Sequence, residues 1–117
     1  MKTTEIIIRI YDEVGGDAAI SVSDGDEIYK KIDAAISNQI VVVLDFQNVN
    51  LIITSFLNAC IGQLYSKYNS AELNQSLKFK NIKQEYNHLI VMTKKRAKEY
   101  FEDPAGFDKS LSEVLGS

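Results

Sequence analysis

Residues 41–58 read VVVLDFQNVNLIITSFLN and change from strand-forming to helix-forming residues within a few positions. The aliphatic run Ile40–Phe46 does not alternate with polar residues, which is typical of an interior strand of an α/β sheet that is covered on both faces. From Thr54 to Tyr68 the apolar residues recur at helical spacing and form a wide apolar face. We therefore expect a buried strand that ends near Asp45, a loop, and a helix that begins at the hydroxyl pair Thr54–Ser55.

Patterns of the same kind predict the elements on either side of this stretch. Alternating apolar residues indicate strands at 4–11, 18–23 and 77–82, and the lysines of the last strand suit the edge of a sheet. Helical spacing indicates two further helices, at 24–38 and 83–102.

The predicted order is β-β-α-β-α-β-α, and the predicted fold class is α/β, with helices packed on a small mixed four-stranded sheet. Gly15-Gly16-Asp17 is expected to be a hairpin turn that pairs the first two strands antiparallel, because glycine adopts the positive φ that such turns need. The third strand, the helix after it and the fourth strand should form a right-handed parallel crossover. Ser23 or Asp24 is expected to cap the first helix. We expect one domain over residues 1–103 and a short tail over 104–117.

Length and composition indicate one globular domain. The chain has 117 residues, of which 45% are hydrophobic and 25% are charged, as in ordinary soluble proteins. The aliphatic run is far too short to span a bilayer, and residues 1–5 lack the apolar core of a signal peptide. The single cysteine, Cys60, cannot form an internal disulfide, so a reducing cytoplasm is the predicted location.

The sequence contains none of the common motifs of catalytic or phosphate-binding sites. Glycine-rich phosphate loops, the His-Glu-x-x-His zinc motif and the Gly-x-Ser-x-Gly nucleophile motif are all absent. A Cys-His nucleophilic pair would need Cys60 and His88 to meet. Cys60 falls on an apolar helix face and is expected in the core, whereas His88 is expected at the surface or at the edge of the core. We therefore predict that the protein is not an enzyme and that it uses no metal or cofactor.

Asp45 and the pair Thr54–Ser55 remain as candidate functional residues, each with two interpretations. Asp45 closes an aliphatic strand, where an ionised carboxylate must be exposed or paired. It either accepts hydrogen bonds from N–H groups of the following loop, or meets a ligand or partner at the carboxyl end of the strand. Thr54 or Ser55 either caps the helix, or carries a phosphate that the free N–H groups and the dipole of a helix start would stabilise. The residues themselves leave these alternatives open.

Residues 78–98 form a basic block in a protein of net charge −3, with seven Lys or Arg against one Glu. One interpretation is a surface for nucleic acid or for an acidic protein partner. The other is a solvated strand edge followed by lysines near a helix C-terminus, where the helix dipole favours cations. The overall acidic charge favours the second interpretation.

The stretch quoted above also resembles a known family. The residues that carry the resemblance are Leu44-Asp45-Phe46, Val49, Ile53-Thr54-Ser55-Phe56-Leu57-Asn58, Ile61-Gly62 and Leu64, with Ile20-Ser21-Val22-Ser23-Asp24-Gly25 upstream. In this pattern the chain resembles the bacterial STAS-like domains of unknown function, roughly over residues 18–100 and most specifically over 43–64. These domains are related to the STAS domains of anti-sigma factor antagonists and sulfate transporters.

The resemblance implies a switch at the start of the helix. In anti-sigma factor antagonists a strand that ends in an aspartate precedes an Asp-Ser-Ser/Thr-Gly motif, and a serine kinase phosphorylates the hydroxyl at the helix start, which switches partner binding. Ser55 matches the phosphorylated position and Thr54 the residue before it. Ile53 stands in place of the motif's aspartate. Phe56 stands in place of its glycine and is expected to pack into the core.

We therefore expect a cytoplasmic bacterial protein-interaction module without catalytic activity, which resembles the anti-sigma factor antagonists and acts in signalling or transcriptional regulation. Ser55 is the candidate phosphoacceptor. The expected partner is another protein, such as an anti-sigma-type or histidine-kinase-like ATPase or serine kinase. The alternatives are a sensor domain for a small ligand (a nucleotide or a lipid) and nucleic-acid binding through residues 78–98. The residues expected to contact the partner are Asp45, Asn48, Asn50, Thr54, Ser55 and Asn58.

Overall fold

The computed structural model describes residues 4–102. Its elements in chain order are β1 (Glu5–Arg9), α1 (Ile10–Val14), β2 (Ala18–Ala19), α2 (Val22–Ser37), β3 (Val41–Asp45), β4 (Leu51–Ile52), α3 (Thr54–Cys60), the 3-10 helix η1 (Gly62–Ser66), α4 (Ser70–Ser76), β5 (Leu77–Lys80), the 3-10 helix η2 (Gln84–Tyr86) and α5 (Asn87–Glu102). The tail predicted over 104–117 lies outside the described residues. Within the described part of the chain, no helix is long and apolar enough to cross a membrane.

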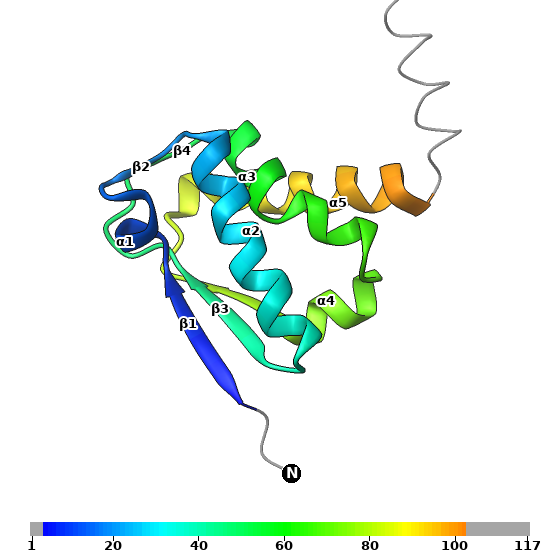
Figure 1. Cartoon of the computed structure of the whole chain (residues 1–117). Coiled ribbons are helices and arrows are strands. Elements are labelled where there is room, and N and C mark those ends of the chain that lie inside the picture. Colours follow the sequence, from blue (N-terminus) through cyan, green and yellow to red (C-terminus); the bar gives the residue numbers. More distant parts are fainter. Residues whose placement is uncertain (1–3, 103–117) are drawn as a thin grey trace, which may run out of the picture.

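β1, β3 and β5 form the main sheet, in which the strands are parallel and β3 is central (Figure 1). In this register Ile7 lies beside Val43, and Val43 lies beside Lys78. The predictions of an interior strand at 40–46, of an edge strand near 77–82 and of parallel pairing between them are confirmed.

The predicted hairpin is wrong, and the mixed four-stranded sheet is not formed. β2 does not pair with β1 but pairs in parallel with β4, in a separate two-stranded sheet. The chain passes from β1 directly into α1, and Gly15 (φ 76°) ends that helix. The N–H groups of Gly15 and Gly16 both donate to Tyr11 O at 3.0 Å. A positive φ suits the end of a helix as well as a hairpin turn, so the glycine pair did not distinguish the two.

α2, α3, α4 and α5 lie on the same side of the main sheet (Figure 1). The core between the sheet and these helices includes Ile8 of β1, Leu44 of β3, Ile32 of α2 and Leu57 of α3. The helix predicted at 24–38 is α2. It begins slightly earlier than expected, because Ser21 caps it by accepting a hydrogen bond from the backbone N–H of the third helical residue at 3.2 Å.

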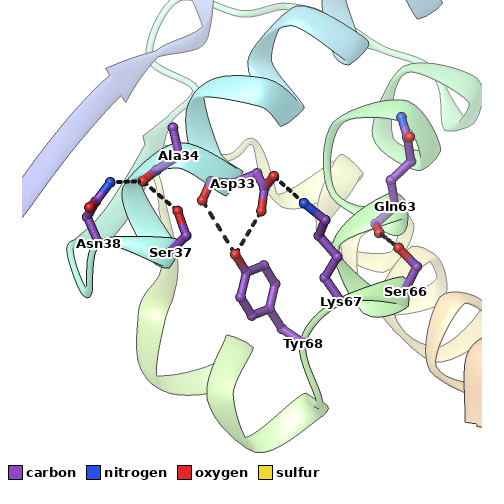
Figure 2. Close-up of polar contacts among 8 residues, drawn as sticks. All are labelled: Asp33, Ala34, Ser37, Asn38, Gln63, Ser66, Lys67 and Tyr68. Atoms are coloured by element: carbon purple, nitrogen blue, oxygen red, sulfur yellow. Dashed lines mark hydrogen bonds and ion pairs between the residues drawn. The ribbon is translucent and has the colours of Figure 1, made fainter.

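The helix predicted over 54–68 is shorter than expected, because α3 is followed by η1 and then by α4, which the sequence patterns did not indicate. Asp33 of α2 holds this connection in place. Its carboxylate accepts a hydrogen bond from Tyr68 Oη (2.7 Å) and pairs with Lys67 Nζ (2.7 Å), as Figure 2 shows. Burial and the hydrogen bond to Asp33 raise the pKa of Tyr68 to about 12. A capping box over Asn69–Glu72 then starts α4.

Candidate functional site

The last residues of the three main-sheet strands lie in one row at the carboxyl edge of the sheet. In the parallel register Arg9 of β1 pairs with Asp45 of β3, and Asp45 pairs with Lys80 of β5. A central carboxylate therefore has a cationic residue on each side. Asp45 is only 5% exposed, so its charge needs partners inside the protein.

Two hydrogen-bond donors and one lysine surround the Asp45 carboxylate. Its Oδ1 accepts hydrogen bonds from Gln47 N (2.9 Å) and Asn81 Nδ2 (2.9 Å), and its Oδ2 lies 3.9 Å from Lys80 Nζ. Burial by itself would raise the pKa of Asp45. The hydrogen bonds from Asn81 and Gln47, with the charges of Lys80 and Arg9, outweigh burial and lower the pKa below its ordinary value. Of the two interpretations of Asp45, the bond to a backbone N–H of the following loop is therefore present.

Asp45→Asn is expected to make the protein less sensitive to acid. Because the pKa of Asp45 is lowered in the folded protein, the ionised carboxylate stabilises the fold above about pH 4, and this contribution is lost as the pH falls through the folded-state pKa. The variant should be less stable than the wild type at pH 7, by about 1–2 kcal/mol, and the difference should shrink as the pH falls below about 4. Urea titrations at a series of pH values measure both quantities. A difference that does not change as the pH is lowered would contradict the role given to the charge.

An open cleft of about 350 Å³ lies at the same edge of the sheet. Its lining comes from the end of β1, from α1 and from β3 with the loop after it, and consists of Arg9, Tyr11, Asp12, Asp45, Gln47 and Asn48. Sequence reasoning missed Arg9, Tyr11 and Asp12, because the predicted hairpin concealed that β1 runs parallel to β3. It also missed Asn81, because the prediction placed this residue inside the strand 77–82, whereas β5 ends at Lys80 and Asn81 follows it.

The hydroxyl pair at the start of α3 does not cap that helix. The N-cap residue is Ile53, in an extended conformation, and it makes no side-chain cap. Thr54 and Ser55 are the first two helical residues, and both are exposed. Within residues 4–102 neither hydroxyl has a hydrogen-bond partner. The interpretation of the pair as a helix cap is therefore wrong.

α3 turns its polar and apolar residues to opposite sides. Phe56 and Leu57 are fully buried, whereas Thr54, Ser55 and Asn58 are exposed. Residues spaced three and four apart share one face of a helix, so Asn58 lies on the same face as the hydroxyl pair. The expectation that Phe56 packs into the core is confirmed, and Ser55 stays exposed beside it.

The two loop asparagines have different surroundings. The side chain of Asn50 donates to Asp17 Oδ2 (3.1 Å), and its backbone N–H donates to Asp17 O (2.8 Å). Its carbonyl oxygen accepts a hydrogen bond from Tyr86 Oη (3.0 Å). Asn48 is exposed, has a left-handed φ of 68° and lines the cleft. The six residues predicted to bind a partner therefore divide into Asp45 and Asn48 at the cleft, the exposed face of α3, and Asn50, which ties the loop to the segment before β2.

Apolar side chains are exposed in the segments around the start of α3. β4 leads directly into α3, β2 pairs with β4, and Ile53 N donates to Ala19 O (3.2 Å), so these segments adjoin. We call the whole region the α3 surface: it combines the polar Thr54, Ser55 and Asn58 with the exposed apolar Ile20, Val22 and Leu51. Exposed apolar side chains mixed with polar groups are common where one protein contacts another.

Cys60 and His88 do not form a nucleophilic pair. Cys60 is fully buried, and burial raises the pKa of its thiol, whereas His88 is exposed on α5. In the range 4–102 no group of three or more His, Cys, Asp or Glu side chains is arranged to hold a metal ion.

Lysines of the basic block 78–98 take part in structural contacts. Lys78 Nζ donates to Asn74 O (2.7 Å), and Lys94 Nζ lies 4.9 Å from the centre of the Phe79 ring. Partial burial, with the nearby charge of Lys78, lowers the pKa of Lys94. These contacts fit the interpretation of the block as a sheet edge and a helix face.

A parallel sheet covered by helices on one side, with an exposed hydroxyl pair where a helix begins, defines a small α/β domain. The family model of the STAS-like domain of unknown function matches residues 24–87, from the first turn of α2 to the start of α5. Because this match covers more than half of the chain, the protein belongs to that family. Asp45 and the start of α3 lie inside the matched segment, whereas Arg9 and Tyr11 lie outside it. No curated protein and no solved structure matches the chain.

Proposed function

We propose that this protein is a non-catalytic interaction module of bacterial signalling or transcriptional regulation, and that a partner protein binds its α3 surface. The observation that carries the proposal is the exposure of Thr54 and Ser55, whose hydroxyls neither cap α3 nor bond to any other described residue. Exposed polar residues with no part in the fold are candidates for function. The exposed Leu51 in the preceding strand would supply the apolar contact that stable binding needs.

Ser55 is the candidate switch of this surface. A phosphate on Ser55 would add about −1.5 to −2 charges at the second position of α3. Negative charge in the first turn is compatible with the helix dipole, so phosphorylation would leave the fold intact. The same charge would disfavour an interface that also covers the apolar Leu51. The switch would therefore act on partner binding rather than on folding.

The alternative of a small-ligand sensor draws on the cleft at the carboxyl edge, since ligands of open α/β sheets bind at this edge. The cleft, however, contains both signs of charge, with Arg9 beside Asp12 and Asp45, and the buried Asp45 is already satisfied by the protein itself. The α3 surface instead has exposed hydroxyls that make no hydrogen bond to the described residues. For this reason we prefer a protein partner.

Ser55→Asp is expected to reduce partner capture by at least about tenfold, because like or unpaired charge in an interface costs several kcal/mol. The measurement is affinity capture from lysate of the native host with the wild type and the variant, followed by quantitative mass spectrometry. The matched control is Ala71→Asp, which introduces the same charge at the second position of another helix, α4, at an exposed residue.

A protein captured by the wild type and by Ala71→Asp, but lost with Ser55→Asp, supports the switch. A partner retained by Ser55→Asp but lost with Leu51→Asp supports the α3 surface without the switch. A partner captured equally by the wild type, by Ser55→Asp and by Leu51→Asp contradicts the proposed binding surface.

A further inference from the structure

The two edges of the main sheet are protected to different degrees. β5, at one edge, exposes Lys78 and Lys80, and charged residues of this kind keep a sheet edge from pairing with another chain. β1, at the other edge, has the sequence Glu-Ile-Ile-Ile-Arg, with Ile6 36% and Ile7 48% exposed. It contains no lysine, proline or glycine, and its charged residues, Glu5 and Arg9, stand at its two ends. An edge strand whose centre is three isoleucines, with charges only at its ends, is open to pairing where those charges find opposite partners.

The backbone hydrogen bonds between β1 and β3 show which residues of β1 have backbone groups available to pair with another strand. Thr4 O accepts a hydrogen bond from Val41 N (2.8 Å) at the start of the β1–β3 ladder. Backbone groups alternate in direction along a strand, so Ile6 and Ile8 face β3, and the backbone groups of Glu5, Ile7 and Arg9 face away from the sheet. α1 begins at the next residue, so among residues 4–102 the unpaired edge is limited to this segment.

A second copy of β1 fits this edge in one orientation. If two copies pair antiparallel around a two-fold axis at Ile7, each Glu5 lies opposite Arg9 of the partner subunit, and each Ile6 lies opposite Ile8 of the partner subunit. Opposite charges directly across a strand pair are stabilising. Parallel pairing in register would instead place like charges opposite each other, which is destabilising.

The same arrangement would extend the charge pattern at the carboxyl edge of the sheet. Arg9, Asp45 and Lys80 already lie side by side on three neighbouring strands, with alternating signs. Directly opposed residues of a strand pair share one face, so Glu5 of the partner subunit would be the next residue in this row, beside Arg9. Charge complementarity therefore points to a second copy of this chain as the occupant of the edge.

We propose that β1 is a self-association surface through which two copies of the protein join their main sheets, with antiparallel β1 strands centred on Ile7. Five residues a side bury far less than a standard interface, so the dimer should be weak, with a dissociation constant on the order of 10–500 µM. The surface is separate from the α3 surface, so this proposal does not depend on the proposed function.

Sedimentation equilibrium of the full chain between about 10 µM and 1 mM tests the proposal. The wild type should show a monomer–dimer equilibrium, and Ile7→Lys should raise the dissociation constant at least about tenfold, because it places two lysines opposite each other at the axis. Val91→Lys is the matched control, since Val91 is 64% exposed on α5, and it should leave the equilibrium unchanged. A wild type that stays monomeric at about 1 mM, or a dimer that survives Ile7→Lys, overturns the proposal.

Charge exchange tests the orientation of the strands. Glu5→Arg and Arg9→Glu should each weaken self-association, because each places like charges across the two-fold axis. A mixture of the two variants should form a heterodimer at least as tightly as the wild type forms its dimer, because every facing pair is then opposite in charge. Circular dichroism of each variant confirms that it is folded. Failure of the two folded variants to associate when mixed overturns the antiparallel register.

Discussion

Phe56→Ala is expected to lower the free energy of unfolding by about 3–5 kcal/mol. Phe56 is fully buried and belongs to the core that α3 shares with α2 and the sheet. Truncation removes its apolar area from the core and leaves a cavity that the closely packed neighbours fill only in part. Typical domains are stable by only about 5–15 kcal/mol, so the variant would lose a large fraction of its stability.

Urea unfolding followed by circular dichroism measures this loss. Phe56→Leu, which keeps an apolar side chain of intermediate size, should lose clearly less than Phe56→Ala. Val91→Ala is the surface control and should change stability by no more than about 0.5 kcal/mol. If Phe56→Ala is as stable as the surface control, Phe56 is not a core residue, and it could then cover Ser55 instead of supporting the helix that presents it.

The centre of the fold was predictable because its sequence permits few alternatives. The continuous aliphatic run over residues 40–44 is typical of an interior strand, so the central position of β3 followed from the residues alone. The expected cover on both faces is not what the structure shows, because α2, α3, α4 and α5 lie on one side of the sheet (Figure 1). Parallel pairing with β5 followed from the helical segment between the two strands. The inward direction of Phe56 followed from the helical spacing of its apolar neighbours.

The hairpin could not be excluded from sequence, because one local feature serves two structures. The pair Gly15–Gly16 supplies a positive φ, and the short segment before it could extend the first strand or form one helical turn. The choice depends on whether β2 finds its partner in β1 or in β4, and that pairing is a long-range interaction with almost no local signal. The wrong hairpin also affected the prediction of the candidate site, because an antiparallel hairpin does not indicate that Arg9 lies beside Asp45.

Only part of the candidate site could be predicted, because the rest depends on long-range strand pairing. The bond from Gln47 N to Asp45 is local and could be expected, whereas the bond from Asn81 depends on the register of β5 against β3. The prediction that Thr54 or Ser55 caps α3 was wrong by one or two positions, because the N-cap residue is Ile53. Ile53 is still extended as the chain leaves β4, and this makes it the boundary residue of α3 although its side chain cannot cap.

Gly25→Ala is expected to lower the free energy of unfolding by about 1–3 kcal/mol, opposite in sign to its usual effect in a helix. Alanine ordinarily stabilises a helix interior by about 0.8–1 kcal/mol relative to glycine. At Gly25, however, an added Cβ would lie 2.8 Å from Phe56 O and 2.9 Å from Ala59 Cβ. The backbone oxygen belongs to α3 and cannot rotate away as a flexible side chain would. α2 and α3 would have to separate, and the buried residues between them would lose contact.

Thermal and urea unfolding of Gly25→Ala and of the control Gly16→Ala decide between helix propensity and close packing. An added Cβ at Gly16 meets no atom within 4 Å, and Gly16 has no positive φ, so this control should be neutral or slightly stabilising. Because the close approach at Gly25 sets how closely α3 packs on α2, Gly25→Ala should shift α3 and weaken partner capture at the α3 surface even below its melting temperature. A stabilised Gly25→Ala would mean that the helices stand farther apart, and that the position of Ser55 is not fixed by their packing.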